Sequence, residues 1–118
     1  MVVVGADTHE TLSGIATGDV SLLDEALSLR DAHRERTGLD GRTFALVKIA
    51  ALIALDAPPA SYAWQVANAL GDGASPEDIV AVLRAVAPQV GGPRVVAAAP
   101  ELMLALGLAL PETEESGV

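Results

Sequence analysis

Small aliphatic side chains, with very few aromatic ones, most limit what this chain of 118 residues can fold into. Hydrophobic residues make up 51% of the sequence and aromatic residues only 3%, and alanine and leucine are the commonest apolar types. Both are strong helix formers, and small or unbranched side chains let helices approach closely. The composition therefore favours an all-α protein over a β-sandwich or a nucleotide-binding sheet, and the length fits a single domain.

Charged residues are scarce and mostly acidic. They make up 19% of the chain, whereas an average domain has about a quarter. So few charges cannot cover the roughly 6,000 Å² that a folded monomer of this size exposes, and we expect a homo-oligomer in which another subunit buries apolar surface. The formal net charge of −9 argues against nucleic acid and anionic membranes as partners, because both need a basic face.

The sequence contains no cysteine. This excludes disulfides, thiolate metal sites, iron–sulfur clusters and cysteine nucleophiles. Residues 91–92 are glycines but lack the strand and further glycines of a phosphate-binding loop, and we predict neither a metal nor a cofactor. No apolar stretch reaches the about 20 residues of a membrane span, and the first residues do not read as a secretory signal. A cytoplasmic protein is the default expectation.

Apolar periodicity and capping signals predict a bundle of about five to six helices. The clearest local signal is Ser75-Pro76-Glu77-Asp78, in which serine caps a helix, proline takes its first position and acids fill its first turn. Asp40 is expected to cap the preceding apolar helix in the same way. The predicted helices span about residues 19–36, 41–55, 60–70, 76–87 and 93–106, with at most a short helical turn at 10–16. Pro88 is expected to end or kink its helix, and Pro100 to bend the last one.

The predicted helices define the domain organisation. We expect a flexible N-terminal arm over residues 1–18 and a single helical domain over 19–110. The acidic segment 111–118 is expected to be disordered.

Two ionisable side chains stand out because they lie on apolar helices. His33 falls on the same stripe of the 19–36 helix as three apolar residues, so it should point toward packing. It can be a hydrogen-bonded or interface histidine, or a catalytic acid or base. Lys48 is the one charge in the 41–55 helix. It can extend to the surface along its alkyl stem, or be buried and paired.

Five segments, taken with their order and spacing, resemble the carboxymuconolactone decarboxylase family, whose wider superfamily includes the AhpD-like alkylhydroperoxidases. The strongest pieces are the helix start Gly-Ala-Ser-Pro-Glu-Asp-Ile at residues 73–79 and the turn Gly-Gly-Pro-Arg at residues 91–94. The resemblance covers about residues 22–106. The segments are residues 39–43, 46–55, 63–70, 73–79 and 88–94.

The resemblance implies an all-helical subunit that assembles into trimers or hexamers, with sites between helices near subunit boundaries. The peroxidase branch of the superfamily uses a Cys-x-x-Cys pair, which this chain lacks. The decarboxylase branch usually has a histidine in the third helix, where this chain has Gln65. A common arginine of the second helix is matched by Phe44, and a common cysteine before the Gly-x-Pro turn by Val90. Cysteine-dependent peroxidase chemistry is therefore excluded.

Two hypotheses on function remain open. In one, the protein is a non-catalytic oligomer, structural or binding a small carboxylated ligand, because three reactive positions of the family are lost. In the other, it is a lyase, decarboxylase or isomerase of a small cyclic carboxylated or lactone substrate. Gln65 would then hold the substrate, Tyr62 or Trp64 would form the pocket wall, and His33 would replace the missing proton donor. Trp64 as a core residue and Gln65 as an ordinary helix residue are the structural alternatives.

Overall fold

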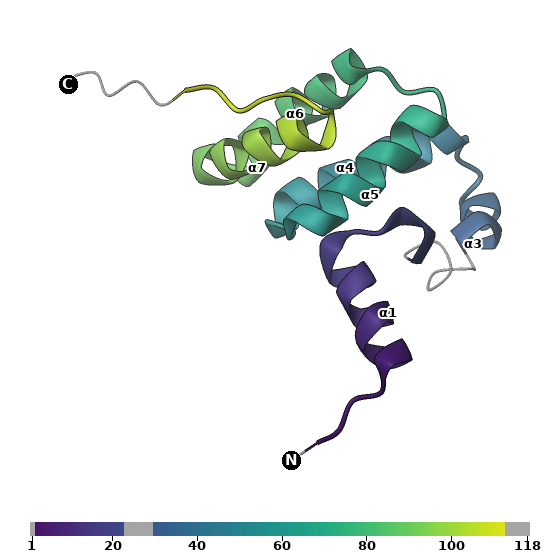
Figure 1. Cartoon of the computed structure of the whole chain (residues 1–118). Coiled ribbons are helices and arrows are strands. Elements are labelled where there is room, and N and C mark those ends of the chain that lie inside the picture. Colours follow the sequence, from purple (N-terminus) through teal and green to yellow (C-terminus); the bar gives the residue numbers. More distant parts are fainter. Residues whose placement is uncertain (1, 23–29, 113–118) are drawn as a thin grey trace.

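The computed structural model describes residues 2–22 and 30–112, and this part of the chain is helical throughout, without strands (Figure 1). The prediction of an all-α protein is confirmed. Apart from a helical stretch at residues 20–22, the described residues form six helices. These are α1 (Ala6–Thr17), α3 (Arg30–Thr37), α4 (Gly41–Leu55), α5 (Pro59–Gly71), α6 (Pro76–Val90) and α7 (Gly92–Ala105).

The core lies between α4, α5, α6 and α7. A turn at residues 56–58 joins α4 to α5, and the two helices run antiparallel side by side (Figure 1). Gly41 at the start of α4 lies beside Asp72 just after α5, since a Cβ built on Gly41 would be 3.1 Å from the Asp72 carboxyl carbon. The buried core is aliphatic with one phenol. It consists of Ala45, Ile49, Ile53, Tyr62, Val66, Ala69, Ala74, Ile79, Ala98 and Leu102.

Two predicted helix caps are confirmed and are linked to each other. The Asp40 carboxylate accepts a hydrogen bond from the Thr43 N–H at 2.7 Å at the start of α4. At the start of α6 the Ser75 hydroxyl accepts from the Asp78 N–H at 3.1 Å, while the Asp78 carboxylate accepts from the Ser75 N–H at 2.9 Å. The same carboxylate pairs with the Arg42 guanidinium, with the closest N···O distance 2.7 Å. The capping box therefore also ties α6 to α4.

The N-terminal segment differs from its prediction, because α1 is a helix of 12 residues and not a short turn at 10–16. It ends at Gly18, which has a φ of 79° and closes the last turn with its N–H on the Ile15 carbonyl. A glycine takes this left-handed conformation without a steric penalty. No residue of α1 is buried and the helix projects away from the bundle (Figure 1). α1 therefore has no buried apolar stripe from which it could have been predicted, and its own backbone hydrogen bonds define it.

The predicted helix over residues 19–36 is described only at its ends. Residues 20–22 are helical and α3 covers Arg30–Thr37, while residues 23–29 lie outside the described residues. The expected disordered tail also falls largely outside them, since the description ends at residue 112. None of the described helices is both long and apolar enough to cross a bilayer.

The two helix-interior prolines do not end their helices. α6 continues past Pro88 to Val90, so an end near residue 87 was wrong, and α7 runs through Pro100. Pro88 removes one N–H donor near the C-terminus of α6, but its position is exposed and water can bond the freed carbonyl. The Gly91 N–H bonds the Ala87 carbonyl at 3.0 Å and completes the final turn. Exposure thus makes the missing bond tolerable.

Candidate functional site

Gln65 is the one buried polar residue in the described part of the chain, with 6% of its surface exposed. It lies on the inward face of α5, where Tyr62 and Ala69 also point into the core. Its amide oxygen, Oε1, has no hydrogen-bond partner within the described residues. A buried polar atom without a partner costs about 1–3 kcal/mol of stability, so this atom needs an explanation.

Asn68, one turn further along α5, has the same property. Its amide nitrogen, Nδ2, is buried and also lacks a hydrogen-bond partner within the described part of the chain. Residues three apart lie on the same side of a helix, so Gln65 and Asn68 present an unused acceptor and an unused donor next to each other. Turning both amide groups by 180° exchanges these roles but keeps one donor and one acceptor. The arrangement can hold a carboxamide or a protonated carboxyl group through both atoms, and a carbonyl or carboxylate oxygen through the donor alone.

On the neighbouring helix α4, Phe44 and Lys48 lie one turn apart. The antiparallel register set by Gly41 and Asp72 places Lys48 level with Gln65. The Lys48 ammonium lies 4.6 Å from the centroid of the Phe44 ring, a cation–π contact. Phe44 itself is buried, with 4% of its surface exposed. Phe44 therefore puts an apolar ring where the resemblance implies an arginine, and the Lys48 ammonium lies over that ring.

His33 lies on α3, against the same phenylalanine. The two ring centroids are 5.9 Å apart with an interplanar angle of 66°, an edge-to-face contact. The His33 side chain is exposed, which differs from the expected packing position. Two of the three apolar residues that shared its predicted stripe fall at 23–29, outside the described residues. The structure thus places His33 at the outer edge of Phe44 and Gln65 on the inner side of α5.

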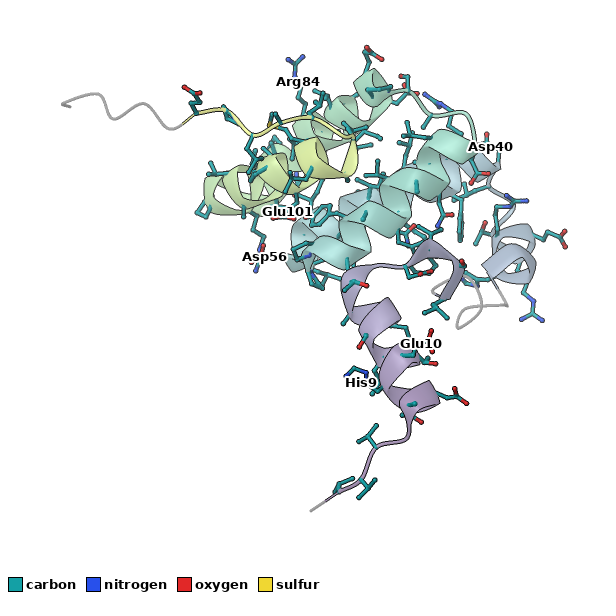
Figure 2. The ribbon with its side chains drawn as sticks, viewed as in Figure 1. His9, Glu10, Asp40, Asp56, Arg84 and Glu101 are labelled. Atoms are coloured by element: carbon teal, nitrogen blue, oxygen red, sulfur yellow. The ribbon has the colours of Figure 1, made fainter. Side chains whose placement is uncertain are left out.

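Tyr62 and Trp64 are both buried, with 1% and 7% of their surfaces exposed. Tyr62 belongs to the core and lies three residues before Gln65, on a neighbouring part of the same face. Burial raises the pKa of its phenol, and the nearby charges of Asp56 and Glu101 raise this pKa further. Figure 2 shows these two carboxylates at the same end of the α4–α5 pair. Trp64 points about 100° around α5 from Gln65. Burial of both rings fits a core role as well as a pocket wall.

The residues offer hydrogen bonds and apolar walls, with little acid–base capacity. Among the described residues no three His, Cys, Asp or Glu side chains converge as metal ligands would. Amide groups do not exchange protons near neutral pH. The amides of Gln65 and Asn68 can therefore hydrogen-bond a polar group but cannot transfer a proton to it.

Sequence reasoning missed two features. Asn68 was not singled out, although its place three residues after Gln65 was a readable signal. A second feature is an apolar pocket of about 200 Å³ on the outward side of α5, where α1 and α7 meet it. It had no sequence signal, because residues from three helices form it. The pocket is lined by Thr17, Pro59, Ala60, Ala63, Glu101, Leu104 and Ala105.

Comparison with protein families matches residues 10–102 to the carboxymuconolactone decarboxylase family. The match spans most of the chain, so the protein belongs to this family, as its motifs indicated. It is a cysteine-free member, because the whole sequence contains no cysteine. Comparison with curated proteins found no match, and comparison with solved structures found none either.

Proposed function

We propose that this protein is a non-catalytic member of its family that binds a small carboxylated or carboxamide-bearing molecule between α4 and α5. The observation that carries the proposal is the pair of buried, unpartnered amide atoms of Gln65 and Asn68. A bound carboxamide, or a carboxyl group in its protonated form, has both a donor and an acceptor, so it would satisfy both atoms and remove the cost of leaving them unpaired. An ionised carboxylate would accept from Asn68 only. A buried water molecule is the competing occupant.

The side-chain amides of Gln65 and Asn68 do not exchange protons near neutral pH, which supports binding over catalysis. Decarboxylation requires reprotonation of a carbanion or enolate, and a positioned acid usually supplies that proton. Gln65 occupies the position where relatives usually have a histidine, and an amide cannot do this. The lyase or isomerase alternative depends on His33, whose exposed ring lies against Phe44. Turnover of a β-keto acid or lactone by the purified protein, abolished by His33→Ala, would favour that alternative.

We also infer that the protein self-associates, in line with the trimers or hexamers implied by the family. The exposed face of α4 supports this inference, because it presents the apolar residues Val47, Ala51, Ala54 and Leu55. Val47 and Leu55 have 55% and 74% of their surfaces exposed. A second subunit packed on this face would bury these apolar side chains.

Binding is tested by isotope-edited NMR of the purified full chain, with short-chain carboxylic acids, their amides and simple lactones as probes. We expect the side-chain amide signals of Gln65 and Asn68 to shift on addition of at least one probe class. Gln65→Met, which keeps the length of the side chain and removes its amide, should abolish the shift. Gln89→Met, at an exposed glutamine of α6, is the matched control. Unchanged amide signals with every probe would favour water as the occupant and contradict the proposal.

A further inference from the structure

The outward face of α7 carries an apolar stripe that nothing else in the described chain covers. Val96 and Leu104 have 73% and 53% of their surfaces exposed. Pro93 and Ala97, on the same side of the helix, are exposed as well. Pro100 in the middle of the stripe is half-buried. An exposed stripe at this spacing on a helix is typical of a surface that packs on another helix.

Two opposite charges border this stripe on the same side. Arg94 and Glu101 are seven residues apart, which is within about 20° of two full turns, so they lie on one flank of α7 and about 10.5 Å apart along it. Within the described residues neither has an ion-pair partner. Basic residues are scarce in a chain with a net charge of −9. An arginine that forms no ion pair within the described residues, on the same flank as such a glutamate, is therefore a candidate for pairing with another copy.

The charges and the stripe share nearly the same centre. The midpoint between Arg94 and Glu101 falls between Ala97 and Ala98, and the midpoint of the stripe from Pro93 to Leu104 falls one residue further on. One residue corresponds to about 1.5 Å along a helix. This coincidence matters because a two-fold axis makes a surface pack on itself, so charge and apolar pattern must share one centre.

We propose that α7 packs antiparallel on α7 of a second copy of this chain, about a two-fold axis through this centre. In such a pair the same flank of each helix faces its counterpart, and a residue before the axis meets the residue equally far beyond it. Arg94 of each copy then faces Glu101 of the other, which gives two identical ion pairs around an apolar centre. The inference rests on the proposed self-association and names one surface for it.

The pocket beside Glu101 fits this arrangement. Its wall is mainly apolar, with Ala60 and Ala63 of α5 opposite Leu104 of α7, and Glu101 supplies its carboxylate. An arginine reaching Glu101 from a second copy would lay its alkyl stem over such a wall and bring its guanidinium to the carboxylate. Small alanines on both sides of the groove allow a helix to approach closely.

Charge reversal tests the pairing, because an isologous contact makes a distinctive prediction. Arg94→Glu places two pairs of like charges in the contact and should raise its dissociation constant at least about tenfold. Glu101→Arg should do the same. The double variant Arg94→Glu, Glu101→Arg restores both pairs in the reversed sense and should return the constant to within about threefold of the wild type. Native mass spectrometry and light scattering over a dilution series measure the assembly.

The expected result is that each single variant halves the assembled mass at a concentration where the wild type and the double variant stay assembled. Arg84→Glu is the matched control, because Arg84 is exposed on α6 and points away from the bundle (Figure 2). Circular dichroism confirms folding, and Glu101→Gln replaces Glu101→Arg if the latter does not fold. A wild-type monomer would overturn both the self-association and this surface. A wild-type oligomer whose mass Arg94→Glu leaves unchanged would overturn this surface alone.

Discussion

Gln65 and Asn68 lie about one turn apart on α5, and each has a buried side-chain amide atom. Neither the Gln65 oxygen nor the Asn68 nitrogen has a hydrogen-bond partner within the described residues. Most buried side-chain polar atoms in proteins are paired, so these two neighbouring exceptions are the observation on which the proposed binding site rests. The relationship separates recognition from catalysis, because these groups can orient a ligand without carrying its proton.

The first prediction concerns the stability of the ligand-free protein. Replacing Gln65 by Met removes a buried unpaired acceptor with little change in volume, so we expect the free energy of unfolding to stay the same or rise by about 1 kcal/mol. Urea denaturation followed by circular dichroism measures it. Gln89→Met at the exposed position should change it by less than about 0.5 kcal/mol. A loss of 2 kcal/mol or more in Gln65→Met would mean that the amide is structurally bonded.

The second prediction concerns the pH dependence of stability. The Arg42 guanidinium, with the Ser75 N–H adding to it, holds the pKa of Asp78 below its ordinary value of about 3.9. Because the folded-state pKa is the lower one, this carboxylate stabilises the fold above the unfolded-state pKa, and the contribution is lost as pH falls through the folded-state pKa. Asp78→Asn should therefore show a smaller loss of stability on acidification below about pH 4 than the wild type.

The control for this pH effect is Glu77→Gln, one residue away in the same first turn of α6. This variant keeps the Arg42–Asp78 ion pair, so it should keep the part of the acid sensitivity that Asp78→Asn loses. Asp40 also has a lowered pKa, through its bond from the Thr43 N–H, and contributes to the same pH window. Some acid sensitivity should therefore remain in Asp78→Asn. An acid branch as steep as the wild type's would remove the assignment to Asp78.

The third prediction concerns the core contact of α6. Ile79 is completely buried and is the one buried residue of α6. Ile79→Ala should lower the free energy of unfolding by about 2–5 kcal/mol, because it removes buried methyl groups and leaves a cavity. Val80→Ala, at a position 44% exposed, should lower it by less than about 1 kcal/mol. Thermal and urea denaturation of the two variants give the comparison, and similar losses would contradict the burial.

The fourth prediction concerns the face of α4. Val47→Glu puts a charge into the apolar stripe of that helix, so it should weaken self-association while the monomer keeps its helical content. Sedimentation velocity measures the mass, and Val80→Glu on the exposed side of α6 is the control. If both variants assemble like the wild type, α4 is not a subunit contact. The test is independent of the charge reversals on α7.

Prediction from the sequence succeeded where the cause was local. The starts of α4 and α6 could be located because Asp40 and Ser75 bond amides only three residues away. It failed for α1, whose end depends on the backbone of Gly18 and whose surface has no buried stripe. It also failed at Pro88, because whether a lost hydrogen bond ends a helix depends on exposure to water. The role of Gln65 was open for the same reason, since periodicity gives a direction on the helix but not the partners found there.

The sequence by itself determined the helical class, the lack of thiol chemistry and the family. These follow from which side chains and reactive groups are present, and from motifs whose residues are neighbours in the chain. Three further facts come from the packing of the helices: an amide atom of Gln65 and one of Asn68 are buried without a partner among the described residues, His33 is exposed beside Phe44, and Glu101 lines a pocket with α5. Burial and pairing depend on residues far apart in sequence, so packing alone assigns them.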